Sequence, residues 1–492
     1  MRVARMNEAE ERIRLEASVS GLAERAPLVS ARALLTPAQR IGLIGLAALL
    51  VICGILDLKA TAIAVVAVFT AFYLVAVVYR FALFALSAKT ESTIRISDEE
   101  ARAFPDSELP TYTLLIPAYK EPEVISLLLH NIGVMEYPPD LVEVMVLVEA
   151  DDTRTLEAIR SKEPDDRFQL VLVPPAEPRT KPKALNYGLT LARGELVAVY
   201  DVEDEPDPLQ LRRAAVAFST QPPQVGCLQA KLSYDNPAQN IITKWFTIEY
   251  TMWFSFFLPG LASAHAPIPL GGTSNHFRRD VLRRMGAWDP FNVTEDADLG
   301  IRMYREGIGV RILESVTFEE ANSDFVNWTR QRSRWLKGYL QTFLIHFRQP
   351  VRLYRDLGWR GLLHFAVFVG GTPLLALANP AFWFMTVLWF VAYPSFIREI
   401  FPAPVYYAGL LCFTFGNFVM AYLTVVASRT VDEGRYLVPA LLIPLYWIMM
   451  SMAAVKAFWQ IVFTPTLWEK TFHGLGRTTA AEHAPPGAAG QR

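Results

Sequence analysis

The sequence is poor in the residue types that build disulfide frameworks, zinc sites and nucleic-acid surfaces. It contains three cysteines and seven histidines among 492 residues, and its formal net charge is −2. Because Cys53, Cys227 and Cys412 lie far apart in apolar runs, we expect them to be free buried thiols. The near-neutral charge provides no global basic field, so no nucleic acid is expected as a partner.

Glycine-rich nucleotide motifs are also missing. No GxGxxG and no GxxxxGK[ST] follows an apolar run, so neither a dinucleotide-binding fold nor a P-loop is supported. The segment GGTSN (271–275) lacks the P-loop lysine and is not predicted to cradle phosphate. An EF-hand starting at Asp201 is excluded, because Pro206 stands where the loop needs glycine and Arg212 stands where it needs glutamate.

Apolar residues, in contrast, make up 52% of the chain and favour a membrane protein. The runs 41–56 and 60–86 predict a transmembrane hairpin (41–86), since one span needs about 20 apolar residues. The preceding segment, 1–40, carries seven arginines. Excess arginine beside a first span favours a cytoplasmic N-terminal segment, and the hairpin returns the chain to the cytoplasm for the block 90–360.

The C-terminal part, 362–464, predicts three or four further spans. Its first two apolar runs, 365–377 and 381–393, are short and are separated by Asn379-Pro380, so they form either two tilted spans or one kinked span. We prefer six spans in total, because that number leaves both ends of the chain inside. The expectation is a multi-pass protein of the inner (plasma) membrane with a cytoplasmic, largely disordered tail, 465–492.

The middle block alternates short apolar runs with helical stretches. Strands are predicted at 111–117, 142–149, 168–174, 195–201 and 225–232, and helices at roughly 121–135, 153–163, 181–193 and 207–219. Such alternation favours an α/β, Rossmann-like domain with a mainly parallel sheet and helices on both faces. Interfacial helices are expected at 241–260 and 331–348, because a span at 241–260 would place acidic clusters of one site on opposite sides of the membrane.

Polar clusters follow three predicted strands: PAYKE (117–121), EADD (149–152) and YDVEDEPDP (200–208). One such cluster alone is well explained by a solvated turn, but three at one edge of a sheet favour a ligand site. Asp201 and Glu203 could hold Mg²⁺ or Mn²⁺, since these ions take one or two protein carboxylates and complete their shell with substrate phosphates and water. Asp204 stays open as another ligand.

Two further motifs, TED (294–296) and QRSRW (331–335), each begin a helical stretch. TED alone is compatible with a helix start capped by Thr294, with carboxylates near the positive helix end. QRSRW alone is compatible with a basic helix on lipid headgroups. Neither motif identifies a chemistry by itself.

Taken in order, PAYKE, EADD, KPKALNYGL (181–189), YDVED, TED and QRSRW, flanked by apolar helices, resemble the processive family 2 glycosyltransferases. This group contains bacterial cellulose synthase, hyaluronan synthase and chitin synthase, and the resemblance covers about residues 110–345. It implies a GT-A cytoplasmic domain, an inverting hexosyltransferase reaction from a nucleotide-diphosphate sugar (first of all a UDP-sugar), and Mg²⁺ or Mn²⁺. It also implies a growing glycan chain as acceptor, export through the membrane helices amid membrane lipid, and export or regulatory partner proteins.

The resemblance also implies roles for individual residues. Asp296 corresponds to the general base; Glu295, Gln331, Arg334 and Trp335 to the acceptor and diphosphate side; Tyr119, Glu121, Asp151, Asp152, Lys181 and Lys183 to the nucleotide-sugar site, with Lys181 or Lys183 at the diphosphate; and Asp201 and Glu203 to the metal site. The sequence departs from the family's DxD motif, since its second position is glutamate. A base beside the sugar and cations beside the leaving diphosphate are what inverting transfer needs.

Two other functions remain open. Transfer of one sugar to a lipid carrier would use the same donor site, although QRSRW favours chain extension. A catalytically silent channel or receptor would not need Asp201, Asp296 and Arg334 together. The segment FTPTLWEKTFHG (463–474) is predicted from its position and composition to form a lid near the site.

Overall fold

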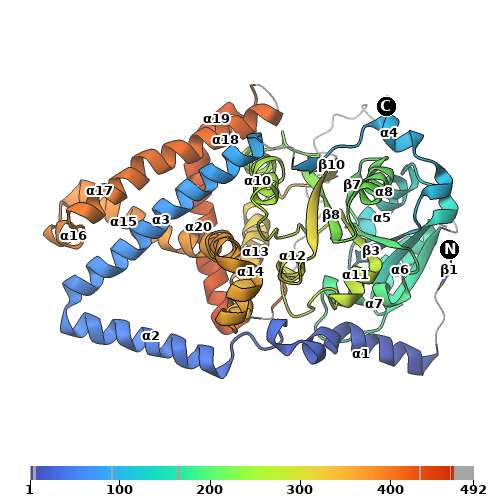
Figure 1. The fold of residues 1–492 in the computed structure, drawn as a ribbon, viewed down its shortest axis with the longest axis horizontal. Helices are drawn as coiled ribbons and strands as arrows, with labels where there is room; N and C mark the ends of the chain where they lie inside the picture. Colours follow the sequence, from blue (N-terminus) through green and yellow to red (C-terminus); the bar gives the residue numbers. More distant parts are fainter. Residues whose placement is uncertain are drawn as a thin grey trace.

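The structure is a computed structural model that describes residues 2–3, 7–89, 92–162, 167–431, 434–465 and 467–469. Figure 1 shows a half built around a β-sheet on the right and a half of long helices on the left. Most of the predicted tail, residues 466 and 470–492, lies outside the described residues.

All five predicted strands are present, with bounds within two residues of the prediction. The sheet order is β1-β5-β4-β3-β6-β9-β8-β10-β2, with β7 beside β10. The strands are β1 (Arg2–Val3), β2 (Thr93–Ile94), β3 (Tyr112–Ala118), β4 (Val142–Glu149), β5 (Phe168–Val173), β6 (Leu196–Val199), β7 (Glu205–Pro206), β8 (Val225–Tyr234), β9 (Asn275–Arg278) and β10 (Gly309–Glu319). Pairing is mainly parallel, and the unpredicted β9 runs antiparallel between β6 and β8.

Helices cover both faces of the sheet because successive strand residues point to opposite sides. Leu114 and Ile116 of β3 pack with one set of helices, whereas Leu115 packs with another. The first set is α5 (Ile125–Gly133), α6 (Thr153–Ser161) and α8 (Gln210–Thr220), and the second includes α7 (Lys181–Leu191) and α12 (Glu295–Arg305). Burial on both faces explains why these strands read as continuous apolar runs.

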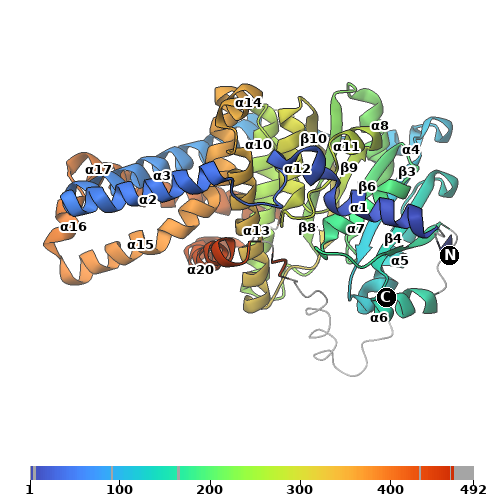
Figure 2. The same ribbon diagram turned by 90° about the horizontal axis from the view of Figure 1, so that it is seen from below.

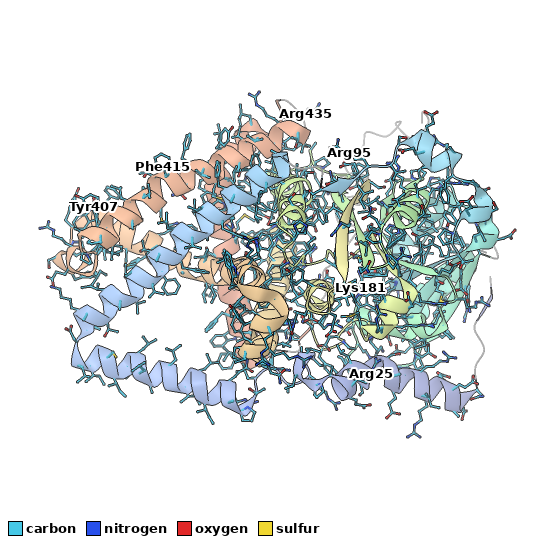
Figure 3. The ribbon with its side chains drawn as sticks, in the orientation of Figure 1. Arg25, Arg95, Lys181, Tyr407, Phe415 and Arg435 are labelled. Atoms are coloured by element: carbon cyan, nitrogen blue, oxygen red, sulfur yellow. The ribbon has the colours of Figure 1, made fainter. Side chains whose placement is uncertain are left out.

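Five helical stretches of the described chain are long and apolar enough to cross a membrane. They are α2 (Pro37–Leu56), α3 (Leu58–Lys89), the stretch Pro350–Ala392, the stretch Ala403–Val431 and α20 (Ile443–Phe463). Their outer sides carry exposed apolar side chains such as Tyr407 and Phe415 (Figure 3). In water these surfaces would be costly to expose, so this half of the molecule belongs in lipid.

The runs 365–377 and 381–393, which we preferred to count as two spans, lie in one continuous helical stretch. It comprises the part of α14 (Pro350–His364) that follows a break at Gly358, where the backbone is not helical, then a π-helical turn (Phe365–Gly370) and α15 (Gly371–Ala392). Pro380 is accommodated inside α15, as prolines often are in apolar helices whose neighbours satisfy the freed backbone groups. The structure therefore takes the one-span alternative, and the described residues do not provide the sixth span.

Helix α20 runs across the other long helices instead of alongside them. It stands upright between the two halves in Figure 1 and is seen nearly end-on in Figure 2, whereas α2, α3 and α15 extend to the far left in both views. It packs against α15 and α13 (Phe325–His346). The remaining long helices form two hairpins that lead away from the sheet and return, α2 with α3 and α15 with α17 (Ala403–Leu411) and α18 (Asn417–Val431).

The stretch 241–260 is helical and is not one of the five long apolar helices. It forms α9 (Ile241–Met252), a π-helical turn (Trp253–Phe257) and the start of α10 (Leu258–Ser263). Phe246, Ile248 and Leu258 are fully buried against the rest of the chain. This segment packs between the sheet and the helical half, since α9 contacts both β8 and α18.

Candidate active site

A cavity of about 400 Å³ lies where β3, β4 and β6 end, beside the start of α12 and the first turns of α13. We call it the catalytic cavity. Ten of the predicted site residues line it, namely Tyr119, Glu121, Lys181, Asp201, Glu203, Glu295, Asp296, Gln331, Arg334 and Trp335. Its walls hold eight carboxylates and four cationic side chains. The site therefore forms at the carboxyl ends of the parallel strands, as open α/β sheets favour.

Lys181 and Asp201 form an ion pair inside this cavity. The Lys181 ammonium donates hydrogen bonds to the Asp201 carboxylate and, at 2.8 Å, to the carbonyl oxygen of Gly272. Burial would lower the pKa of Lys181, but the carboxylates of Asp201 and Glu295 outweigh it and raise this pKa above its usual value. Lys181 therefore stays charged at neutral pH and lies within the sheet-containing half (Figure 3).

Asp204 stabilises the acidic loop 200–208 from the interior of the protein. Its buried carboxylate accepts hydrogen bonds from the backbone N–H of Asp201 at 2.7 Å and from the Thr273 hydroxyl. Burial and the neighbouring carboxylates of Asp201 and Glu203 raise the pKa of Asp204 well above its usual value. Of the two acids that the sequence left open for the second metal contact, Glu203 faces the cavity, whereas Asp204 is turned into the protein.

Lys183 is not brought to the cavity. Its ammonium group is fully buried, 2.7 Å from Glu149 Oε1, and also donates to the carbonyl oxygens of Pro174 and Ala176 at 3.3 Å. These bonds anchor the first turn of α7 to the end of β4. Of the two lysines proposed for the diphosphate, the geometry favours Lys181, because residues two apart on a helix face different sides.

Asp151 and Asp152 line a neighbouring cavity of about 460 Å³, which shares Tyr119 and Arg179 with the catalytic cavity. Asp152 caps α6 and accepts a hydrogen bond from the backbone N–H of Lys120 at 2.5 Å. Asp151 pairs with Arg179 at 2.6 Å, and this hydrogen bond lowers the pKa of Asp151. The EADD motif thus shapes the side of the site furthest from TED.

The TED carboxylates occupy the first turn of α12. Asp296 accepts a hydrogen bond from the backbone N–H of Ala297 at 2.8 Å. Burial raises the pKa of Asp296, and burial together with Asp296 raises the pKa of Glu295 to about 8. Thr294 makes no side-chain capping bond, and a Cβ on Gly338 would come within 2.3 Å of its hydroxyl oxygen. Thr294 therefore stands at the N-cap position without the expected side-chain capping bond, both acids face the cavity, and α13 approaches closely.

Residues of QRSRW form a further part of the cavity wall. Gln331 Oε1 accepts a hydrogen bond from Asn322 at 2.9 Å. The guanidinium of Arg334 lies 4.9 Å from the centroid of the Trp468 ring, and burial lowers the pKa of Arg334. Trp468 also lines the cavity, so the described part of the predicted lid (463–474) does reach the site. Residues 466 and 470–474 of that segment lie outside the described chain.

Sequence reasoning missed several lining residues. The GGTSN loop, which we set aside as a phosphate cradle, contributes Gly271, Gly272 and Thr273 to the wall. Its glycines were the available signal, since a Cβ on Gly272 would lie 3.4 Å from Asp296 Oδ2. Glu319 ends β10, a strand that was not predicted, so nothing in the sequence placed it near Asp201.

A second cavity, of about 780 Å³, continues from the first into the helical half. We call it the helix groove. Glu249, Trp253, Thr372 and Met450 line both cavities. The groove is mainly apolar, runs between α3, α15, α17 and α18, and reaches α16 (Ser395–Ile400) at the far end of the helices (Figure 1). The catalytic cavity therefore adjoins a groove in the helical half.

The carboxylates of the cavity fit a divalent cation that is held jointly by the protein and a substrate. Among the described residues no group of three or more His, Cys, Asp or Glu could enclose a metal ion by itself. Asp201 and Glu203 nevertheless face the cavity together, and acids outnumber cationic groups in its walls. Mg²⁺ and Mn²⁺ accept such two-carboxylate sites when phosphate oxygens complete the shell.

A mainly parallel sheet with an antiparallel insertion, acids at its strand ends and flanking apolar helices defines a GT-A glycosyltransferase domain. Residues 110–338 match the family model described as "Glycosyltransferase like family 2". The protein is therefore a glycosyltransferase with a family 2 domain.

Three curated relatives with names of glycosyltransferases or glycolipid synthases are similar to this chain at modest sequence identity. The chain is 27% identical over 315 residues to a probable glycosyltransferase, YdaM, of Bacillus subtilis, covering 60% of this chain and 74% of that protein. It is 26% identical over 387 residues to the β-monoglucosyldiacylglycerol synthase of Synechocystis, covering 76% and 77%. A probable glucomannan 4-β-mannosyltransferase of Arabidopsis thaliana is 25% identical over 290 residues, covering 57% and 52%.

A solved structure supports the fold. The mannosyltransferase PcManGT from Pyrobaculum calidifontis, solved in complex with GDP-Man and Mn²⁺, superposes with a TM-score of 0.50 at 19% identity. The match covers 82% of this chain and 99% of that one. It extends beyond the family 2 domain, so part of the helical half shares the arrangement as well.

Proposed function

We propose that the protein transfers a hexosyl group, with inversion, from a nucleotide-diphosphate sugar to an acceptor that enters the catalytic cavity from the membrane side. The observation that carries this proposal is the composition of one cavity, which holds Lys181 with Asp201 at one side and Asp296 with Arg334 at another. PcManGT, solved with GDP-Man and Mn²⁺, supports a nucleotide-sugar donor and a divalent metal. A UDP-sugar is the first donor to test.

Asp296 acts as the general base. An acceptor hydroxyl attacks the anomeric carbon, its proton passes to the Asp296 carboxylate, and the bond from the anomeric carbon to the diphosphate breaks with the electron pair leaving on the phosphate oxygen. Burial raises the pKa of Asp296, which strengthens it as a base. Glu295 beside it is protonated at neutral pH, since its pKa is about 8, and so adds no repulsion against an anionic donor.

Cationic groups stabilise the leaving nucleoside diphosphate. Lys181 exchanges its bond to Asp201 for the diphosphate, and Arg334 faces the same charge from α13. Asp201 and Glu203 are the residues that would hold Mg²⁺ or Mn²⁺, which neutralises charge on phosphate oxygens when bound. Tyr119 and Glu121, at the end of β3, lie toward the nucleoside together with Arg179.

The first acceptor we propose is a growing polysaccharide that is exported as it lengthens. Gln331, Arg334 and Trp335 of QRSRW line the catalytic cavity, and the adjoining helix groove, which reaches the far end of the bundle, supports a route for the chain. Aromatic rings along that path, such as Trp383 and Trp389, offer flat faces of the kind on which sugar rings stack. The glucomannan mannosyltransferase relative supports a polymer product.

The second acceptor is a membrane lipid that receives one sugar. The helix groove is mainly apolar, which suits an acyl or isoprenoid chain, and the Synechocystis relative is named as a synthase of a glycosylated diacylglycerol. Either acceptor places the protein in the inner (plasma) membrane with its sheet domain in the cytoplasm, where nucleotide sugars are made.

Incubation of membranes with radiolabelled UDP- and GDP-sugars tests the proposal. We expect one donor to give a labelled polymer, and a solvent-extractable glycolipid alone would establish the second acceptor instead. Asp296→Asn should abolish transfer while the protein remains folded and still binds the donor. Transfer by Asp296→Asn at the normal rate would remove Asp296 as base, and no transfer from any donor by the unaltered protein would favour a silent channel or receptor.

A further inference from the structure

Trp335, the tryptophan of QRSRW, is held in place by a stacked arginine. The guanidinium carbon of Arg332 lies 4.4 Å from the centroid of the Trp335 ring and 4.3 Å from that of Phe246. The two rings are nearly parallel, with an interplanar angle of 20° and centroids 6.3 Å apart. The guanidinium therefore lies against both rings at once, a contact that its flat, delocalised charge favours.

Glu249 of α9 fixes the plane of this guanidinium. Its carboxylate accepts two hydrogen bonds from Arg332, one of them 3.1 Å long, and a third from the hydroxyl of Tyr446 in α20. Arg332 is 5% exposed, and its Nε atom has no hydrogen-bond partner. Glu249 is therefore the hydrogen-bond partner that orients the guanidinium, beside the rings of Phe246, Trp335 and, at 5.8 Å, Trp328. A two-pronged carboxylate contact orients it more strictly than a single bond.

This cluster stands at the junction of the two cavities. Glu249 lines both the catalytic cavity and the helix groove, and Trp335 lines the catalytic cavity on the side toward the groove. Three elements meet there, α9 through Glu249, α13 through Arg332 and Trp335, and α20 through Tyr446. An acceptor moving between groove and cavity must pass these side chains.

We propose that Glu249 is a positioning residue for the acceptor: through Arg332 it sets the plane of the Trp335 ring, so that an acceptor held at the junction presents its hydroxyl to Asp296. Donor binding through Lys181, Tyr119 and Glu121, which lie outside this cluster, does not depend on this plane. The inference rests on the proposed function and deepens it. It applies to a sugar ring or to a lipid headgroup, because both reach Asp296 by the same route.

The test measures how the donor sugar is divided between acceptor and water. Wild type, Glu249→Gln and Arg332→Lys are compared with the radiolabelled nucleotide sugar that the wild type turns over. The share of sugar transferred to acceptor should fall about tenfold in both variants, the equivalent of one desolvated cation–π contact. The KM for the donor, followed by release of nucleoside diphosphate, should stay within about twofold, since a tenfold change would correspond to a lost contact.

Arg332→Lys separates positioning from simple charge pairing. Lysine keeps the charge opposite Glu249 but has no flat group to lie against the two rings, so a purely structural ion pair would be restored and the positioning role would not. If Arg332→Lys or Glu249→Gln transferred the same share of donor sugar to the acceptor as the wild type does, the proposal would be overturned. Equal loss of donor turnover and transfer would overturn it as well, because it indicates a folding role only.

A matched control is Glu314→Gln, which breaks a pair of the same kind, Lys231 with Glu314 at 2.7 Å, away from both cavities. It should divide the sugar as the wild type does. A fall in transfer equal to that of Glu249→Gln would contradict the inference. Absence of any transfer by the wild type is a distinguishable result, because it contradicts the proposed function itself and the inference with it.

Discussion

The ammonium of Lys181 is hydrogen-bonded to the carboxylate of Asp201, the acid that would hold the metal. In the free protein the lysine thus neutralises a charge that a divalent cation would otherwise neutralise. In the proposed function the donor diphosphate and the metal both bind where this pair now stands. We therefore expect donor and metal binding to be linked through Lys181.

Replacement of Lys181 by methionine tests this link. We expect the KM for the nucleotide sugar to rise about tenfold, because one charge-assisted hydrogen bond to the diphosphate is lost. The metal concentration for half-maximal activity should fall, because Asp201 no longer has a competing cation. Steady-state kinetics with separate titrations of donor and Mn²⁺ measure both, and Lys162→Met, at the exposed end of α6, is the control. Opposite changes would contradict the exchange.

Asp201 and Asp204 should respond differently to the same substitution. Burial raises the pKa of Asp204 well above its usual value, and an asparagine can still accept the bonds from Asp201 N–H and Thr273. We expect Asp204→Asn to keep most of the activity, whereas Asp201→Asn should lose about 100-fold or more in kcat. Measured kcat values compare them, and a larger loss in Asp204→Asn would make Asp204 the metal ligand.

The pH dependence of the activity should reveal the ionisation of Glu295. Its pKa is raised by burial and by Asp296 to about 8, so the carboxyl ionises above that pH and adds charge beside the anionic donor. Activity should therefore decline above about pH 8 in the wild type and persist in Glu295→Gln. A pH–rate profile of kcat/KM for the donor distinguishes them, and identical alkaline limbs in both proteins would exclude Glu295 as the cause.

The same group affects stability with a defined sign. Because its pKa is higher in the folded than in the unfolded chain, the folded state binds the extra proton, and the free energy of unfolding falls as pH rises from about 4.5 toward 8. The unfolding midpoint of Glu295→Gln in detergent should change less over this interval than that of the wild type.

Behind the base, Asp298 of α12 joins α13 in a buried ion pair network. Its carboxylate lies 2.7 Å from Arg302 Nε and 3.0 Å from His346 Nε2. Burial would raise the pKa of Asp298, but Arg302 and His346 keep it below its usual value. We expect Asp298→Ala to lower the free energy of unfolding by about 3–5 kcal/mol, since it leaves a buried arginine unpaired.

Chemical unfolding in detergent measures that loss. The control is Glu123→Gln, which breaks a pair with Arg154 whose side chains are 72% and 81% exposed. Solvent screens such pairs, so the control should not shift the midpoint measurably. An Asp298→Ala protein as stable as this control would show that the network does not hold α12.

The predicted strands agree with the structure because burial on both faces leaves an apolar run that can be read directly. The missed strand β9 has only four residues and follows a glycine loop, so neither length nor alternation marks it. Site residues on predicted strand ends, such as Asp201, could be found for the same reason. Glu319 and Trp468 could not, because they come from an unpredicted strand and from a segment whose path depends on the packing of α20.

The sequence also could not determine which of two neighbouring acids, or which of two neighbouring lysines, faces the cavity. Lys181 and Lys183 have the same chemistry, and only the start of α7 decides that one faces the cavity and the other Glu149. Asp204 is as acidic in sequence as Glu203, and only its bonds to Asp201 and Thr273 identify it as a loop support. The sequence is compatible with a capping bond from Thr294, and only the structure shows that its hydroxyl lies against Gly338 of α13 instead.

The crosswise course of α20 determines which end of the chain can reach the chemistry. Two hairpins bring residue 431 back to the side of the sheet, and a helix laid along that boundary, unlike one more crossing, leaves its last residue there too. Trp468, four residues after Thr464, is thereby able to rest on Arg334. Tyr119 and Trp468, about 350 residues apart in the chain, thus line the same cavity. The C-terminal segment therefore contributes to the wall of the catalytic cavity. A protein fused directly after Trp468 should impede donor entry more than one fused before Glu8.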